Sequence, residues 1–403
     1  MKFESHRISE LIEEIAMGPF GSNIKVECFV DDGIPVLNGS NLEGITLKED
    51  SFRYVTEEKA DSLKRANAHR GDIVITHRGT LGQIIYIPQD SKYARYVISQ
   101  SQFRIRCNEK VLPEYLVYYF HTPIGQYKLL SNASQVGVPA LARPSTTFQQ
   151  IEVELPSLTA QKRIVNILRA LDDKIELNNK VNENIAEQAM AVFKSWFVDY
   201  MPYGGTAPKE WRNVILDNIT SLVTRGIAPK YSDDSDQIVI NQKCIRNHMI
   251  DLSLARKHTP KTINEKWLQY GDLLINSTGT GTLGRTAQVW FEPKNLTVDS
   301  HVTIARPAKE NLIFYIGLWG ISNEKEIESL HTGSTGQTEL PRERVKAMEL
   351  LLPDNETLDR FNAIIAPMAA AIVSNQEENQ RLTEIRDALL PKLMSGELVI
   401  PQG

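Results

Sequence analysis

The 403-residue sequence is poor in cysteine and has no long hydrophobic run. Its three cysteines, Cys28, Cys107 and Cys244, lie far apart and form no Cys-x-x-Cys pair, which excludes a disulfide framework and a cysteine-built zinc site. The longest nearly apolar run, 364–373, contains a proline and is far shorter than the roughly 20 residues of a membrane helix. The N-terminus lacks the apolar core of a signal peptide, so we expect a cytoplasmic protein without a membrane span.

The sequence also lacks an excess of positive charge. It has 45 basic and 50 acidic residues, a net charge of −5 and a pI near 6.0, which argues against a non-specific coat on nucleic acid. Two stretches are nevertheless locally basic. Residues 91–108 include Lys92, Arg95, Arg104 and Arg106 and no acidic residue, and residues 243–266 are also predominantly basic. Such stretches suit phosphate contact, although each alone also fits an ordinary solvated surface.

An internal repeat is the most informative feature that is present. Gly-Asp followed by three aliphatic residues occurs at 71–75 and again at 271–275, and each copy continues into a glycine-threonine turn, 79–82 and 279–284. Three further landmarks recur in the same order. They are the pairs 102–106 and 302–306, 137–141 and 336–340, and 151–156 and 348–353. This order predicts a duplicated domain.

Each repeat ends in Leu-Pro and is followed by a segment with apolar residues at three-, four- and seven-residue steps, which predicts an amphipathic helix. Each helix should have about 40 residues and a length of roughly 60 Å at ~1.5 Å per residue. Pro367 should kink the second helix without ending it. The apolar stripes favour an antiparallel, coiled-coil-like pair that holds two globules apart; the alternative is that each helix packs only on its own globule.

No catalytic motif is found in the sequence. An Asn-Pro-Pro-aromatic methyltransferase motif, a Walker A loop and a His-Glu-x-x-His zinc helix are all missing, and His77 and His301 are expected to be polar loop residues, not metal ligands. The Gly279-x-Gly281-x-x-Gly284 turn has the form of a dinucleotide fingerprint. The residues after it favour a strand where pyrophosphate binding needs a helix, so we predict a turn between two strands.

The repeat resembles the target-recognition domain of type I restriction–modification specificity subunits. The resemblance rests on the Gly-Asp strand with Arg78-Gly79-Thr80-Leu81-Gly82, on Leu155-Pro156 leading into 161–165, on the helix end 194–200 and on the C-terminal run 389–398. It covers both halves of the chain. The first copy departs from the pattern in lacking the Trp-containing lead that Trp211 provides in the second, which leaves its N-terminal edge open.

The resemblance implies an α+β fold with two pseudo-repeated mixed α/β target-recognition domains, separated by two long antiparallel helices. The expected domains are a first recognition domain at 1–155, a central conserved helix at 156–200, a second recognition domain at 201–353 and a C-terminal conserved helix at 354–403. It further implies binding of double-stranded DNA at a bipartite, asymmetric site and assembly with two methyltransferase subunits and ATP-driven restriction subunits. S-adenosylmethionine and ATP would belong to those partners, and this chain would hold no cofactor and no catalytic residue.

Polar and basic residues near the shared turns and after the paired strands are the candidates for DNA contact. Arg78 and Gln100 are suited to bidentate contacts with guanine and adenine. The loops 131–137 and 332–337 are further candidates. The predicted DNA-binding residues are Thr76, His77, Arg78, Thr80, Lys92, Arg95, Gln100 and Gln102 in the first half and Asn276, Ser277, Thr278, Thr280, Arg285, Ser300 and His301 in the second.

Three other functions remain open from the sequence. The first is a specificity subunit of a related complex that methylates or cleaves DNA differently. The second is a self-contained DNA-modifying enzyme with an unrecognised active site. The third is a structural adaptor whose helices bind proteins and whose globules never touch DNA.

Overall fold

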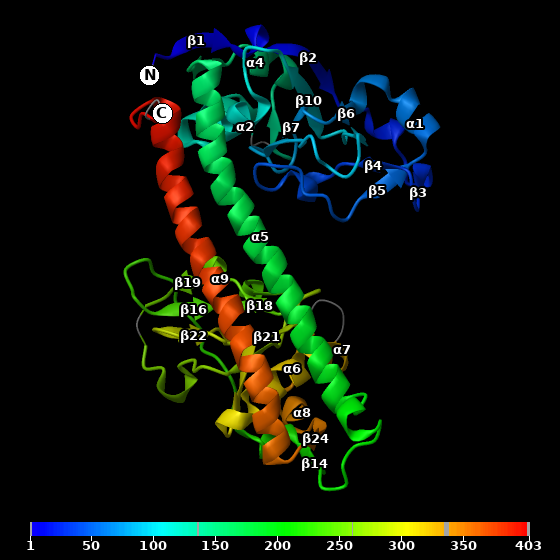
Figure 1. Ribbon diagram of the computed structural model, residues 1–403, viewed down its shortest axis with the longest axis vertical. Helices are drawn as coiled ribbons and strands as arrows, with labels where there is room; N and C mark the ends of the chain where they lie inside the picture. The colour runs from blue at the N-terminus through cyan, green and yellow to red at the C-terminus, as the bar shows by residue number, and fades with distance from the viewer. Residues whose placement is uncertain (1, 135–136, 260, 334–337, 401–403) are drawn as a thin grey trace. The chain divides into compact units, whose positions relative to one another are not determined.

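The computed structural model describes residues 2–134, 137–259, 261–333 and 338–400 (Figure 1). The chain divides into two compact units: unit 1 comprises 1–175 and 380–403, and unit 2 comprises 176–379. Each unit is an α+β globule together with one part of each of two long helices. No helix within the described ranges combines the length and the apolar character that crossing a membrane requires.

The globule of unit 1 contains an antiparallel four-stranded sheet in the order β2-β10-β7-β8. A second sheet has the order β3-β5-β4-β9-β6, and β1 pairs with β13. The strands are β1 (Glu4–Arg7), β2 (Ile12–Met17), β3 (Phe29–Val30), β4 (Ile34–Val36), β5 (Arg53–Val55), β6 (Asn67–His69), β7 (Ile73–Thr76), β8 (Ile84–Tyr86), β9 (Arg95–Val97), β10 (Gln102–Cys107), β11 (Ala133–Ser134), β12 (Ala140–Leu141) and β13 (Glu152–Leu155). The short helices are α1 (Glu57–Ser62), α2 (Pro113–His121), α3 (Pro123–Leu130) and α4 (Pro144–Gln149).

The globule of unit 2 contains a four-stranded antiparallel sheet in the order β15-β23-β20-β21. Beside it are a sheet β19-β16-β22 and the pairs β14-β24 and β17-β18. The strands are β14 (Arg212–Ile215), β15 (Thr220–Arg225), β16 (Ile238–Ile240), β17 (Ile245–Arg246), β18 (Met249–Ile250), β19 (Arg256–Lys257), β20 (Leu273–Asn276), β21 (Thr286–Gln288), β22 (Leu296–Val298), β23 (Val302–Pro307) and β24 (Glu349–Leu352). The short helices are α6 (Ile313–Ser322), α7 (Glu324–Ser329) and α8 (Arg342–Lys346).

The predicted duplication is confirmed by the matching strand orders. The repeated Gly-Asp motif has the same structural role in both units. Gly71 and Gly271 each adopt φ +87°, a left-handed conformation that favours glycine. Asp72 and Asp272 are both fully buried, and each accepts two hydrogen bonds from an arginine 34 positions later. The partner is Arg106 for Asp72 (2.9 and 3.2 Å) and Arg306 for Asp272 (2.8 and 2.8 Å). The motif therefore anchors the central strand to its neighbour by a bidentate ion pair.

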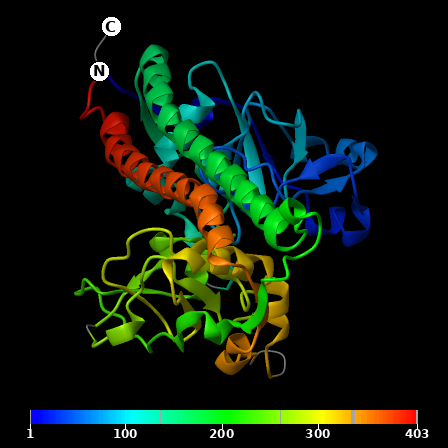
Figure 2. The ribbon, with the colours of Figure 1, turned by 60° about the horizontal axis from the view of Figure 1, so that its bottom comes forward.

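The two long helices are α5 (Leu158–Phe197), of 40 residues, and α9 (Asn355–Ser395), of 41 (Figures 1 and 2). In unit 1, Ile164 and Leu168 of α5 share a core with Leu390 and Leu393 of α9. In unit 2, Phe193 of α5 shares a core with α9, its ring lying 6.3 Å from that of Phe361. Within both units α5 contacts α9 in opposite chain directions, so the predicted antiparallel pairing is confirmed, and α9 continues through Pro367 as expected.

Four asparagines join the helices inside unit 2. Asn178 donates to Asn379 Oδ1 at 2.8 Å, and Asn375 donates to Asn182 Oδ1 at the same distance. Asn178 corresponds to Asn375 in the repeat and Asn182 to Asn379, so the two contacts are related by the duplication. Asn178 and Asn182 are only 3% and 2% exposed. Buried amides of this kind favour one register of a helix pair over its alternatives.

Asp172 of α5 has two side-chain partners on other helices. It accepts hydrogen bonds from Tyr118 Oη at 2.6 Å and from Arg386 at 2.7 Å, all within unit 1. Asp172 thus ties α5 both to α2 and to α9. Burial and this neighbouring carboxylate raise the pKa of Tyr118, so its hydroxyl stays protonated and acts as the donor.

Candidate nucleic-acid interface

In both globules the same set of turns meets where the strands of the four-stranded sheet end, on one side of the globule. We call this set the loop face: residues 18–24, 77–83, 98–101 and 137–141 in unit 1, and 226–231, 277–285, 299–301 and 338–340 in unit 2. The turn after β7 is bonded through His77 N to Ser101 O (2.9 Å), and the turn after β20 through Ser277 N to His301 O (2.8 Å). The sheet hydrogen bonds thereby hold equivalent turns together in both copies.

The other segments join the loop face through equally matched contacts. Gly18 N donates to Gln102 O (2.8 Å), and Gly226 N donates to Val302 O (3.1 Å). A Cβ atom at either glycine would lie 1.9 Å from a backbone oxygen, that of Ser99 or of Val298, so only glycine permits this approach. Leu141 N and Leu340 N complete each loop face by donating to His77 O and Ser277 O.

In unit 1 the loop face presents Arg78, Thr80 and Gln100 as exposed side chains. His77 is half-buried between them, with Nε2 3.2 Å from Gln100 O. Burial lowers the pKa of His77, so its imidazole is neutral at pH 7 and contributes hydrogen bonding rather than charge. Arg78 is therefore the cation that this turn offers to DNA.

In unit 2 the exposed residues of the loop face include Thr280 and His301, and Thr278, Arg285 and Ser300 are half-buried. Thr278 Oγ1 lies 2.8 Å from His301 Nδ1, which joins the two turns through their side chains. Asp299 accepts a hydrogen bond from His301 N at 2.9 Å and so shapes the second turn. The structure brings these five predicted residues together on the loop face of unit 2.

Four predicted DNA-binding residues are buried and serve the fold instead. Thr76 donates to Gln83 Oε1 (3.0 Å), and Gln102 accepts from Ser99 N (2.8 Å). In unit 2, Asn276 donates to Gln242 O (3.0 Å), and Ser277 Oγ lies 2.6 Å from Thr303 Oγ1. All four are at most 3% exposed. These side chains shape the turns and do not reach a surface, so we remove them from the candidate interface.

The basic stretch 91–108 does not form a free positive surface, contrary to the expectation from its composition. Arg104 is 3% exposed and bonds to Glu14 (2.9 Å) and Asp72 (3.3 Å), and Arg106 is the bidentate partner of Asp72. Arg95 is paired with Asp61 at 2.6 Å. Lys92 is exposed, with its ammonium 5.2 Å from the centre of the Tyr93 ring. Only Lys92 of this set keeps its charge exposed and outside an ion pair in the described structure.

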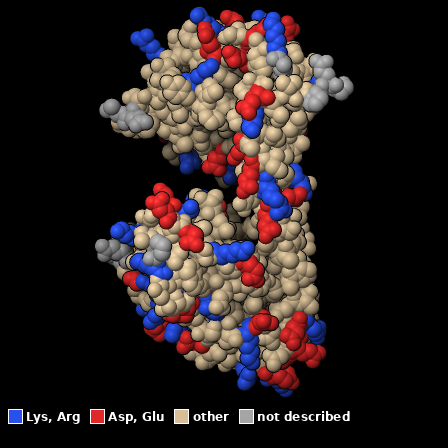
Figure 3. All heavy atoms as spheres, turned by 90° about the vertical axis from the view of Figure 1, so that its left-hand side faces the viewer, with Lys and Arg blue, Asp and Glu red and all other residues tan. Residues whose placement is uncertain are grey.

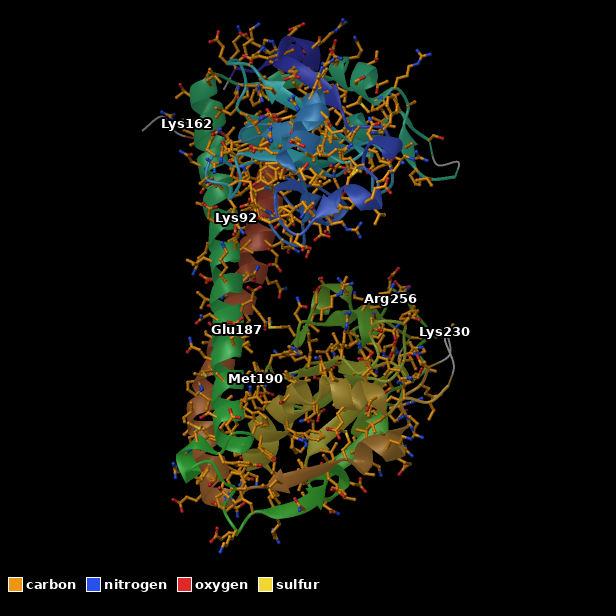
Figure 4. All side chains as sticks on the ribbon, turned by 90° about the vertical axis from the view of Figure 1, so that its right-hand side faces the viewer. Lys92, Lys162, Glu187, Met190, Lys230 and Arg256 are labelled. Carbon is orange, nitrogen blue, oxygen red and sulfur yellow. The ribbon has the colours of Figure 1, made fainter. Side chains whose placement is uncertain are left out.

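In unit 2 a group of basic side chains, which we call the basic edge, lies at and beside the loop face. The guanidinium of Arg256 lies 3.6 Å from the centre of the exposed Tyr231 ring, and Lys230 and Lys257 are exposed beside this pair. Figure 4 shows Lys230 and Arg256 at the side of unit 2 away from α5. On the face drawn in Figure 3, basic and acidic side chains alternate over each unit, so positive charge is local. The edge suits phosphate contact.

In unit 1 two neighbouring strands, β5 and β3, carry a related but less basic arrangement. Arg53 of β5 lies 5.2 Å from the centre of the Phe29 ring on β3. Nearby, Phe20 is 82% exposed, and a pocket of about 450 Å³ opens beside it. The sequence reasoning missed Phe20, because an apolar residue is read as core; the flanking Gly18, Pro19 and Gly21 were the signal for an exposed turn.

The predicted turn between two strands at 279–284 is confirmed, because β21 follows it at Thr286. Glu324 at the start of α7 accepts hydrogen bonds from Thr286 N and Oγ1 and pairs with His248 at 3.2 Å. These contacts hold the end of the turn. The candidate loops 131–137 and 332–337 include residues 135–136 and 334–337, which lie outside the described residues.

Comparison with known proteins adds independent information. The sequence model of the type I restriction modification DNA specificity domain matches residues 17–187. The type I restriction enzyme MjaIX specificity subunit of Methanocaldococcus jannaschii is 26% identical over 379 residues, covering 87% of this chain and 83% of that protein. The HindI specificity subunit of Haemophilus influenzae is 23% identical, with 82% and 87% covered.

A solved structure shares the fold. The crystal structure of the type I restriction–modification S subunit from M. genitalium matches with a TM-score of 0.58 and 14% identity, covering 100% of this chain and 97% of that one. At this identity the likeness concerns the architecture and not individual side chains.

Proposed function

We propose that this chain is a type I restriction–modification specificity subunit and recognises the DNA sequence for a methylating and cleaving complex. It is a non-catalytic subunit that reads a bipartite, asymmetric site in double-stranded DNA. Each globule would read one half of the site through its loop face. The division follows from the duplication, since two copies of one scaffold provide two readers.

One observation carries this proposal: the backbone of the loop face is repeated, whereas its side chains are not. Unit 1 offers Arg78, Gln100 and the apolar Phe20, and unit 2 offers His301 and the Arg256–Tyr231 pair. A repeated backbone with different side chains is what recognition of two different half-sites requires, because base edges are distinguished by the side chains that meet them.

We assign DNA contact to those candidate residues whose side chains are exposed or half-buried. In unit 1 these are His77, Arg78, Thr80 and Gln100, with Lys92 as a phosphate contact; Arg95 is retained only as a structural ion pair. In unit 2 they are Thr278, Thr280, Arg285, Ser300 and His301. The residues added from the structure are Phe20 in unit 1 and Lys230, Tyr231 and Arg256 in unit 2.

Partners and cofactors follow from the same proposal. Two methyltransferase subunits and the restriction subunits would assemble with this chain, and S-adenosylmethionine and ATP would bind to those partners. The complex would act in the cytoplasm, where the DNA is. The four domains predicted from the sequence, with boundaries after residues 155, 200 and 353, are part of this proposal.

Mapping methylated adenines in the source genome, with and without this chain, tests the function. We expect one bipartite motif to lose methylation when the chain is deleted and to regain it on complementation. Unchanged methylation at every motif would contradict the proposal. Incubating the purified chain alone with DNA and S-adenosylmethionine is the second arm, since methyl transfer without partners would identify an enzyme instead.

A further inference from the structure

The segment after β2 presents an aromatic ring to solvent at the loop face of unit 1. Phe20 is 82% exposed although phenylalanine normally buries most of its surface. Its backbone is nevertheless ordered by contacts on both sides. Asn23 N donates to Phe20 O at 2.8 Å, and Gly18 is held against β10. The ring is therefore exposed on a turn whose backbone is held by hydrogen bonds, and its exposure does not result from poor core packing.

A pocket of about 450 Å³ lies directly beside this ring. Its apolar walls include Phe20, Ile24 and Phe29, and its polar rim includes Asn38, Arg53 and Gln100. Apolar walls with a polar rim suit a nucleobase. The faces of a base stack on apolar or aromatic groups, and its edge needs hydrogen-bond donors and acceptors. The size of the pocket leaves room for one purine or pyrimidine.

Local contacts orient the polar groups at the rim. Asn38 Oδ1 accepts hydrogen bonds from Ser40 N and Oγ, at 2.8 and 2.6 Å, so its side chain offers the amide nitrogen as a donor. Gln100 lies over Gly21, where a Cβ atom would come within 2.2 Å of its Oε1. Arg53 adds a cation at the rim beside the Phe29 ring. Together they provide donors, an acceptor and one positive charge.

Charge favours DNA over an apolar protein surface as the occupant. The pocket rim carries Arg53, and the neighbouring turn carries the exposed Arg78, so a polyanion is attracted to this side of unit 1. In unit 2 the equivalent segment, 226–231, has the exposed Ala228 two positions after Gly226, where unit 1 has Phe20 two positions after Gly18. The exposed aromatic residue of that segment, Tyr231, already has the guanidinium of Arg256 3.6 Å from its ring centre, so we expect base stacking on Phe20 and not in unit 2.

We propose that unit 1 unstacks one nucleobase of its half-site and holds it against Phe20 in this pocket, with Gln100 and Asn38 at the base edge. This inference rests on the proposed function and adds a base-binding site to it. Apolar side chains inserted at a base step separate neighbouring bases, and an unstacked base regains the lost contact by stacking on an aromatic ring. Unit 1 would therefore sense how readily its half-site is deformed as well as its base edges.

The test uses the full chain assembled with its methyltransferase subunits and duplexes that carry 2-aminopurine at each position of the two half-sites in turn. Binding should raise the fluorescence at the target adenine of each half-site, because methyltransferases extrude the base that they modify. The unaltered complex should show an additional rise at one further position of the unit 1 half-site and no additional rise in the unit 2 half-site. Phe20→Ala should abolish this rise and weaken binding about 5- to 150-fold, the range found for stacking of one base. Phe20→Trp should retain both.

Val26→Ala is the matched control, because Val26 is 81% exposed in the same segment but does not line the pocket. It should behave as the unaltered chain does. No fluorescence rise in the unit 1 half-site beyond that of the target adenine, or equal binding by Phe20→Ala and Val26→Ala, would overturn the inference while specific binding to the mapped site persists. Loss of discrimination between that site and a scrambled duplex by the unaltered complex would instead overturn the proposed function.

Discussion

At the scale of single residues, the two globules separate side chains that build the turns from side chains that face outward. The repeated aspartates Asp72 and Asp272 belong to the first class, since each is fully buried and bonded to its arginine. Burial raises the pKa of Asp272, and the hydrogen bonds from Arg306 oppose this rise. The repeated motif that identifies the duplication is therefore structural, and we propose that specificity resides in its non-repeated neighbours.

Arg78→Ala should weaken recognition of the unit 1 half-site by about 1–3 kcal/mol, or relax it at one base pair, because a bidentate contact to guanine has about this value. Quantitative footprinting of the assembled complex on variants of the mapped site measures this. Lys162→Ala, which removes an exposed cation on α5 of the same unit, is the control (Figure 4). Identical footprints for Arg78→Ala and the unaltered chain on both halves would refute the assignment.

At the scale of elements, hydrogen bonds and ion pairs decide how each turn and helix is held. In unit 2 the pair His248–Glu324 supports the turn before β21. The hydrogen bond to Glu324 raises the pKa of His248 above 6.5 although burial opposes the shift. For Glu324, burial favours the neutral acid, but the hydrogen bonds from His248 and Thr286 outweigh it and lower the pKa below 4.5.

His248→Gln should destabilise unit 2 mainly at mildly acidic pH. A raised histidine pKa contributes stability below 6.5 that is lost as the pH rises through the folded value, and a lowered glutamate pKa contributes stability above 4.5 that is lost as the pH falls. The difference in the free energy of unfolding between the variant and the unaltered chain should thus be largest between these limits. Denaturant titrations from pH 5 to 8 measure it; a difference independent of pH would contradict the ion pair.

At the scale of the whole molecule, duplication makes each globule a separate reader. Replacing residues 1–155 with the corresponding segment of a relative that has a different target should change one half of the methylated motif and leave the other half intact. The physical reason is that all candidate contacts of unit 1 lie within that segment, on turns that its own sheet holds together. Sequencing of methylated DNA from cells that carry the chimera measures the outcome. A motif altered in both halves, or in neither, would show that the globules do not read independently.

Much of the architecture was predictable because its signals are local in the sequence. The recurrence of Gly-Asp strands and Leu-Pro ends predicted the duplication, and apolar periodicity predicted two helices of about 40 residues and their pairing. A strand or a helix stripe depends on neighbouring residues, so composition and spacing suffice to identify it. The same reasoning placed the turns around Arg78 and His301 at the candidate interface. Within unit 1 the structure brings the first turn to the turn that carries Gln100, and within unit 2 it brings the second to Thr278.

Whether a polar or apolar side chain points inward was decided only by the tertiary structure. Thr76 and Arg78 lie two positions apart, yet one is bonded to Gln83 inside the globule and the other is exposed. Arg104 forms ion pairs with Asp72 and Glu14, which lie 32 and 90 positions away in the sequence. Phe20 becomes a surface group because Gly18 fits closely against Ser99. Each outcome depends on contacts between segments distant in the chain, which local pattern does not contain.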